Sequence, residues 1–230
     1  MTFVSTSAPV RAAAPPALMA CGRRRGYRGA MCNDYRRTPP MDTIREQWSQ
    51  TRLPLRFPEG LPNLASLESI RITDPGAIIR AAGEDPAAAE LVVRRWSWPG
   101  AGGKPVYNYR SDGREFGSRA DGGRCLIVAD GFYEFTAPAD PKQKRKDKWL
   151  FTLPGEPLLM IAGLWRSTAE VGEAFTMLTT EPGADVAPYH SRQVVVVGRA
   201  DWARWLDPAV PAAEICKPLP AGSLGVARVS

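Results

Sequence analysis

The chain has 230 residues, 44% of them hydrophobic, which suits one globular domain and excludes a disordered, collagen-like or repeat protein. No apolar run reaches the roughly 18 residues of a transmembrane helix, and the 22 Pro and 21 Gly indicate many turns and short strands. Of the net charge of +6, residues 1–31 supply five Arg and no acid, which leaves 25 basic against 24 acidic residues and weakens any argument for nucleic acid from overall charge.

Residues 1–31 are expected to be an unstructured leader, because they are rich in Ala, Pro and Arg and show no periodicity. Their composition is similar to that of an organellar transit peptide. Patterned sequence begins directly after Met31, however, which favours a start assigned too far upstream, or a leader that is removed. We therefore expect the folded domain to span residues 32–207.

Residues 38–50 predict the first helix, with Thr38 as its N-cap and with Ile44 and Trp48 on one face. Prolines divide the next segment, residues 53–90, into short pieces. Short strands with β-branched or aromatic residues between turn residues are expected at 69–72, 77–79, 91–98, 125–130, 148–153, 158–165, 174–180 and 193–198. A sheet is therefore the expected scaffold.

Glycine pairs at 102–103 and 122–123 are interpreted as hairpin turns. The basic run KQKRKDK at 142–148 lies between two expected strands, where a solvated loop is the favoured interpretation and phosphate contact the alternative. Residues 201–206 predict a terminal helix whose two Trp side chains face the core. The proline-rich tail, 208–230, is expected to be irregular.

Metal and nucleotide cofactors are not expected. The four Cys, at 21, 32, 125 and 216, form no CxxC pair, and the single His does not complete a zinc site of the usual spacing. No glycine-rich phosphate-binding motif is present. We therefore expect reduced thiols, no cofactor and a cytoplasmic protein.

Four residues are candidates for catalysis: Cys32, Asn108, Glu134 and His190. Taken singly, each has an ordinary structural explanation, such as a buried thiol, a turn histidine or a water-facing strand residue. Functional roles are favoured instead when the motifs around these residues are read together in chain order: MCN, WSWPG, NYRSDGR, RCLIVADGFYEF, MIAGLW and HSRQVVVV. From Met31 to about Leu206 the chain resembles the SRAP family, the SOS-response-associated peptidase-like, abasic-site processing proteins.

The resemblance implies an α+β fold: a curved, barrel-like, mainly antiparallel sheet with a few flanking helices and a positively charged groove for single-stranded DNA. It implies that Met31 is removed, so that Cys32 becomes the N-terminal residue. It also assigns catalytic roles to Cys32, Asn108, Glu134 and His190, and DNA contacts to Arg110, Arg192 and Trp96. Departures from the commoner family pattern are MCN for MCGR, Asp112 for Glu, Phe135 for Trp and HSRQV for HxRMP.

An N-terminal Cys carries an amine and a thiol on adjacent carbons, which together can close a thiazolidine ring on the aldehyde of a ring-opened abasic site. An α-amino group titrates at about pH 7.7–8.0, so a neutral fraction is available at pH 7. His190 is expected to move protons, and Glu134 to act as a general acid/base or to hold the ammonium group. Asn108 would orient Cys32 or the sugar by neutral hydrogen bonds.

These inferences predict a covalent DNA–protein cross-linking, lyase-like enzyme, with autopeptidase-type processing at the Met31–Cys32 bond. Its partner is expected to be single-stranded DNA with abasic sites at stalled replication forks. We expect a monomer that binds no metal or membrane and associates with the nucleoid when bound to DNA. Two alternatives remain: a thiol peptidase that uses Cys32, His190 and Asn108, and a non-covalent single-stranded DNA-binding module with an inert Cys32.

Overall fold

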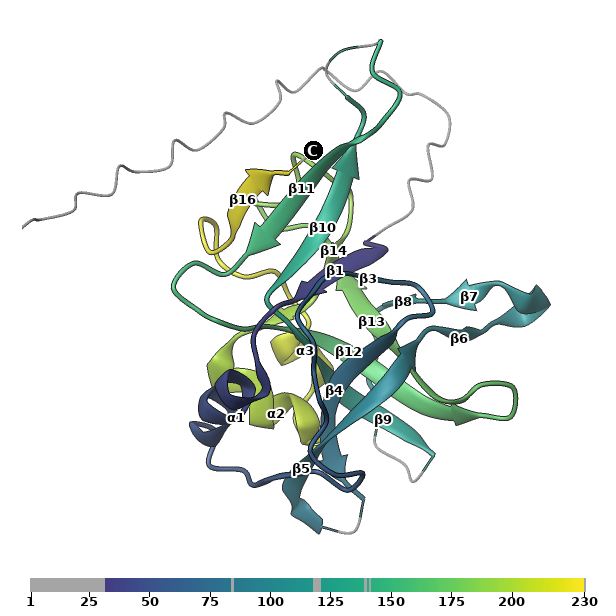
Figure 1. Ribbon diagram of the computed structural model, residues 1–230, viewed down its shortest axis with the longest axis vertical. Coiled ribbons are helices and arrows are strands. Elements are labelled where there is room, and N and C mark those ends of the chain that lie inside the picture. The colour runs from purple at the N-terminus through teal and green to yellow at the C-terminus, as the bar shows by residue number, and fades with distance from the viewer. Residues whose placement is uncertain (1–31, 84, 118–120, 139, 141, 230) are drawn as a thin grey trace, which may run out of the picture.

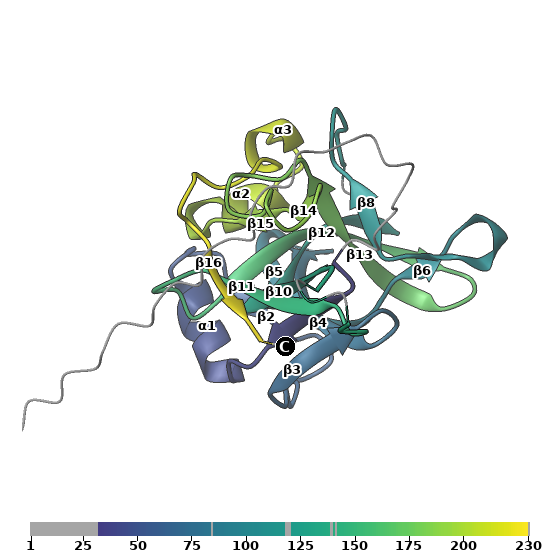
Figure 2. The same cartoon turned by 90° about the horizontal axis from the view of Figure 1, so that it is seen from above.

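The computed structural model describes residues 32–229 except 84, 118–120, 139 and 141. The leader expected at 1–31 lies outside the described residues. The described chain folds mainly into strands, with a few short helices gathered on one side and the β6–β7 hairpin on the opposite side (Figures 1 and 2). None of the described helices has the length and apolar content to cross a membrane.

A five-stranded antiparallel sheet stands at one end of the molecule, at the top of Figure 1. Its strands, in spatial order, are β16 (Gly225–Arg228), β11 (Asp147–Thr152), β10 (Gly131–Thr136), β1 (Asp34–Arg37) and β3 (Leu67–Arg71). In this order β1 lies between β10 and β3, so Cys32, two residues before β1, lies beside β10.

A nine-stranded sheet forms the body of the fold. Its spatial order is β14 (Gln193–Val194), β13 (Gly172–Thr180), β12 (Leu159–Thr168), β9 (Gly122–Ala129), β4 (Pro75–Ala82), β5 (Asp85–Trp96) and β2 (Leu55–Arg56), with β15 (Val196–Val197) on β12 and β8 (Asn108–Arg110) on β13. A further parallel pairing of β13 with β5 closes a ring of β13, β12, β9, β4 and β5. The expected curved, barrel-like, mainly antiparallel sheet is confirmed.

Alternate residues of the ring strands enter two separate apolar cores, as the two-residue period of a strand dictates. Ile78 of β4 and Ile127 of β9 belong to one core with Cys32 and Trp96, whereas their neighbours Ile79 and Leu126 pack into the other. The sheet is therefore buried on both faces, which explains why its strands are continuous apolar runs in the sequence.

The helices cover the second core. They are α1 (Met41–Ser49), α2 (Trp202–Leu206) and α3 (Ala212–Ile215). Two short 3₁₀ turns, η1 (Ala101–Gly103) between β6 and β7 and η2 (Arg199–Asp201) before α2, bury no residue. Ile44 and Trp48 are buried on one face of α1, as expected. The expected N-cap is wrong: Pro40 precedes the helix, and Thr38 donates its Oγ1 hydrogen to Asp130 at 2.6 Å instead.

Two expectations for irregular segments are also wrong. Gly122 begins β9 rather than a turn, and a Cβ there would lie 2.9 Å from the carbonyl oxygen of Trp165, so close pairing of β9 with β12 requires glycine. The tail is not irregular throughout, since α3 and β16 lie in it. The hairpin between β6 (Trp98–Pro99) and β7 (Pro105–Val106) turns through Ala101–Gly103, which confirms the turn expected there.

Candidate functional site

Cys32 lies two residues before β1, in contact with Asn108 of the other sheet, and only 1% of its surface is exposed. Its Sγ lies 3.5 Å from the carbonyl oxygen of Asp34. Burial, followed by the nearby Glu134 carboxylate, raises the pKa of the Cys32 thiol well above its usual value. In this environment the thiol is neutral, and forming a thiolate requires a partner that takes its proton.

Glu134 lies in β10 with 1% of its surface exposed, and neither of its carboxylate oxygens has a hydrogen-bond partner among the described residues. Burial raises the pKa of Glu134 to about 8, and the nearby backbone N–H of Cys32 opposes this shift by a smaller amount. An unpaired buried carboxyl costs folding free energy, so such a group indicates a functional role rather than a structural one.

Asn108 opens β8 and reaches Cys32 from the other sheet: its Nδ2 donates a hydrogen bond of 3.0 Å to the carbonyl oxygen of Cys32. Its Oδ1 is buried and has no hydrogen-bond partner within the part of the chain that the structure describes. The structure thus brings three of the four expected catalytic residues together, from segments that are far apart in the sequence. A thiol, a carboxyl and an amide converge there.

Trp96 supports this group instead of facing DNA. It is fully buried, packs edge-on against Tyr35 of β1 with ring centroids 5.3 Å apart, and donates from Nε1 to the carbonyl oxygen of Tyr107 at 2.9 Å. No face of its ring is open to a base. Because Tyr107 precedes Asn108 and Tyr35 follows Cys32, Trp96 instead fixes the segments that carry both residues.

His190 lies in the turn before β14, and no hydrogen bond given by the structure joins it to Cys32, Asn108 or Glu134. Its Nδ1 lies 3.0 Å from the backbone oxygen of Arg192 and 3.1 Å from the backbone nitrogen of the same residue. The adjacent Tyr189 packs on Trp149, the cross-strand neighbour of Glu134, with ring centroids 4.8 Å apart. Through Tyr189 and Trp149, His190 therefore belongs to the same region as the other three residues.

The two arginines expected to bind DNA differ in their surroundings. Arg110 is exposed at the end of β8, on the same face as Asn108 by the two-residue period of the strand. Arg192 is mostly buried: its Nη2 pairs with Asp112 at 2.6 Å and donates to the carbonyl oxygen of Thr179 at 2.9 Å. The hydrogen bond from Arg192 lowers the pKa of Asp112, so this ion pair persists at neutral pH.

Two charged residues near Cys32 were not expected from the sequence. Asp34 is buried and pairs with Lys148 at 2.8 Å. An acidic residue in a strand of buried positions was the available signal for Asp34, and the basic run at 142–148 was the signal for Lys148. Across the described residues, no group of three or more His, Cys, Asp or Glu is arranged to hold a metal ion.

Among the solved structures with the same fold are three proteins from two bacteria. A protein from Bordetella bronchiseptica superposes with a TM-score of 0.65 and 22% identity, over 86% of this chain and 100% of its own. A phage-related protein from the same organism gives 0.62 and 22%, over 86% and 94%. A protein from Bacteroides thetaiotaomicron gives 0.62 and 15%, over 86% and 92%. No curated protein matches the chain significantly.

Residues 31–230 match the family described as SOS response associated peptidase (SRAP). The match includes Cys32, Asn108 and Glu134, the three residues that the fold brings together, and it covers most of the chain. The protein therefore belongs to the SRAP family, and this membership supports a role associated with DNA damage.

Proposed function

We propose that the protein is an abasic-site processing protein that binds single-stranded DNA and forms a covalent thiazolidine cross-link between Cys32 and the ring-opened abasic deoxyribose. The observation that carries this proposal is the position of the Glu134 carboxyl, buried without a partner beside the backbone nitrogen of Cys32. The backbone N–H of Cys32 lowers the pKa of that carboxyl by less than burial raises it, so the amide only partly compensates the burial of the charged form. An α-amino group at the same place, produced by removal of Met31, would give it an ammonium partner.

The chemistry balances with the groups at the site. The neutral amine of Cys32 adds to the aldehyde, and loss of one water gives an imine; the sulfur then bonds to the same carbon and the thiol proton passes to the nitrogen. Glu134, buried beside the nitrogen of Cys32, is placed to accept and return protons at that atom. Asn108 holds the carbonyl of Cys32, which fixes the direction of the new N-terminus.

We assign the DNA contacts of the two arginines according to how exposed their side chains are. Arg110 is exposed beside Asn108 and is suited to pair with a backbone phosphate, a contact that is independent of base sequence. Arg192 is held by Asp112 and Thr179, so we assign it a role in fixing β8 against β13 as well as in the charge of the groove. His190 remains the proposed proton shuttle, and it would act through Nε2, because Nδ1 contacts the backbone of Arg192.

No observation favours a general thiol peptidase. In such a site the His contacts the Cys thiol and the Asn orients the His. Here Asn108 bonds to the carbonyl of Cys32, and the pKa of the Cys32 thiol is raised rather than lowered. We therefore limit the proposed peptidase activity to processing at the Met31–Cys32 bond.

The test is a denaturing gel of protein incubated with single-stranded DNA that carries one abasic site. Protein expressed from Met31 is expected to give a heat-stable shifted band, and mass spectrometry should find Cys32 at its N-terminus. Cys32→Ala should keep its affinity for DNA and lose the shifted band. Cys216→Ala removes a partly exposed thiol elsewhere and should leave the band unchanged.

The same gel with the full chain of 230 residues tests the processing step. A shift from the full chain as well would indicate cleavage at Met31 by the protein itself, whereas a shift only from the Met31 start would mean that the leader blocks the reaction. An adduct that persists in Cys32→Ala would contradict the mechanism. Absence of a shift from both proteins would favour the non-covalent binding module.

A further inference from the structure

The residues proposed for the reaction come from both sheets. Glu134 lies in the five-stranded sheet, and Cys32 precedes its strand β1 by two residues, whereas Asn108 in β8 and His190, in the turn before β14, belong to the nine-stranded sheet. Asn108 crosses between the sheets through its hydrogen bond to Cys32. A proton shuttle has to lie within hydrogen-bonding reach of the reacting atoms, so the turn that carries His190 must also be fixed to the five-stranded sheet.

The His190 turn, residues 183–190, is held together by its own backbone. The nitrogen of Val186 donates to the carbonyl oxygen of Gly183 at 3.1 Å. The nitrogens of Tyr189 and His190 donate to the carbonyl oxygen of Val186 at 2.8 and 3.0 Å, and the Val186 side chain is fully buried. Because these bonds link one end of the turn to the other, a displacement at its start is passed on to His190.

Asp185 attaches this turn to the tail of the chain. Its Oδ1 accepts from the backbone nitrogen of Gly222 at 2.8 Å, and its Oδ2 from that of Leu224 at 3.0 Å. Gly222 has a φ of 82°, in a turn closed by a hydrogen bond of 3.1 Å from the nitrogen of Ser223 to the carbonyl oxygen of Pro220, and glycine adopts this φ without strain. Both oxygens of the carboxylate therefore hold a defined turn of the tail.

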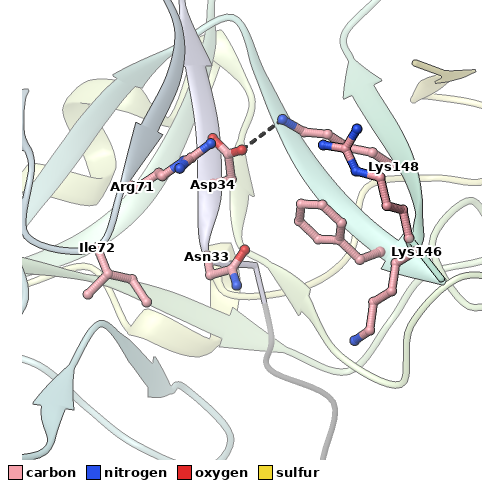
Figure 3. Close-up of a pocket in the computed structure, with 8 residues that line it drawn as sticks. Asn33, Asp34, Arg71, Ile72, Lys146 and Lys148 are labelled. Atoms are coloured by element: carbon pink, nitrogen blue, oxygen red, sulfur yellow. Dashed lines mark hydrogen bonds and ion pairs between the residues drawn. The ribbon is translucent and has the colours of Figure 1, made fainter. Parts of the chain in front are cut away.

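The tail leads from these bonds directly into the five-stranded sheet. β16 follows Leu224 and pairs with β11 (Figure 1). Lys148 of β11 pairs with Asp34 of β1 at 2.8 Å (Figure 3). The next residue of β11, Trp149, lies opposite Glu134 of β10. The tail thus connects the His190 turn to β11, β10 and β1.

A second contact joins the His190 turn to β11. The ring centroid of Tyr189 lies 4.8 Å from that of Trp149 and 5.3 Å from that of Phe151. Apolar packing of this kind tolerates small shifts, whereas hydrogen bonds are directional. The two bonds of Asp185 are therefore the contacts suited to fix the direction of the turn.

We propose that Asp185 is a positioning residue: by binding Gly222 and Leu224, it holds the His190 turn in the place from which His190 transfers protons beside Glu134. This inference rests on the proposed function, because it takes cross-linking as the reaction and His190 as the proton shuttle. It also assigns the tail, residues 218–228, a role in the reaction.

The first test is the rate of cross-linking at saturating abasic-site DNA for protein expressed from Met31. Asp185→Ala should react about tenfold more slowly and keep its affinity for single-stranded DNA that carries a reduced, non-reactive abasic site. In a His190→Ala protein, Asp185→Ala should have no further effect, because it acts through the imidazole. Asp185→Asn has the same shape and keeps one acceptor oxygen, so it should fold and show a smaller decrease in rate.

The second test needs no reaction. His190 is the only histidine of the chain, so the NMR signals of its imidazole C–H groups are unambiguous in protein without a histidine tag. These signals should shift in Asp185→Ala. The matched control is Asp207→Ala, which removes a carboxylate that accepts from the backbone nitrogen of Ala209 at 2.9 Å in another turn. Asp207→Ala should change neither the imidazole signals nor the rate.

The outcomes separate this inference from the proposed function. A normal rate in Asp185→Ala would overturn the inference and leave the function intact. An equal loss of rate with and without His190 would also overturn it, since Asp185 would then act by another route. If the unchanged protein forms no adduct while the imidazole signals still shift in Asp185→Ala, the proposed function alone is contradicted.

Discussion

Glu134 is the residue whose environment is most unlike that of an ordinary side chain of its type. Its pKa is raised from 4.5 to about 8 in the folded chain, mainly by burial, so the folded state keeps a proton that the unfolded state releases between these values. The free energy of unfolding should therefore fall as pH rises from about 5 to 8, by about 5 kcal/mol. Urea denaturation of the full chain at several pH values measures this slope.

Two variants make that prediction specific to Glu134. Glu134→Gln has the same shape and no charge, so it should abolish most of the slope in this window. A chain that begins at Cys32 should also show a smaller slope, because its α-ammonium group pairs with the ionised carboxylate. Glu59, Asp112 and Glu173 have lowered pKa values, so their effects lie below the window. If the pH dependence of the free energy of unfolding persists in Glu134→Gln, another titratable group causes it.

At the scale of elements, the position of β1 decides where Cys32 lies. Tyr35 of β1 is fully buried, and its hydroxyl would be only 2.1 Å from a Cβ at position 76 in β4. Gly76→Ala should therefore push Tyr35 and β1 outward. We expect a loss of stability of about 1–3 kcal/mol and a cross-linking rate at saturating DNA reduced by about tenfold or more. Urea denaturation and the rate of adduct formation measure the two effects.

Gly163→Ala is the matched control for this element. A Cβ at Gly163 in β12 would lie 2.8 Å from the carbonyl oxygen of Thr176 and 3.0 Å from the Sγ of Cys125, so this variant should be destabilised to a similar degree. β12 pairs with β9, β13 and β15, and not with β1. Cross-linking by folded Gly163→Ala should be close to normal. Equal rates in the two variants would mean that contact with Gly76 does not position Cys32.

At the scale of the whole molecule, local patterns predicted the strands but not the distances between them. Alternating and continuous apolar runs are set by neighbouring residues, so the strands were predictable from the sequence. Closure of the ring by β13 and β5, and the contact of Asn108 with Cys32, depend on residues far apart in the chain. Trp96 is the clearest example of what the sequence could not predict. A large aromatic side chain can pack in a core or stack on a DNA base, and in the structure Trp96 is fully buried in the core.

The domain boundary expected at residue 207 gives a prediction about the whole fold. Arg124, which is 2% exposed, donates to the carbonyl oxygens of Asp207 and Val210 at 3.1 and 2.8 Å, and β16 covers the edge of β11. Truncation after Asp207 removes one of these acceptors, the buried residues of α3 and the pairing of β16. The free energy of unfolding should fall by about 5 kcal/mol or more, enough to prevent cooperative unfolding in urea.

Truncation after Arg228 is the control: it keeps these contacts and should change the free energy of unfolding by less than about 1 kcal/mol. Cooperative unfolding of the shorter protein at the normal midpoint would place the end of the domain at 207 after all.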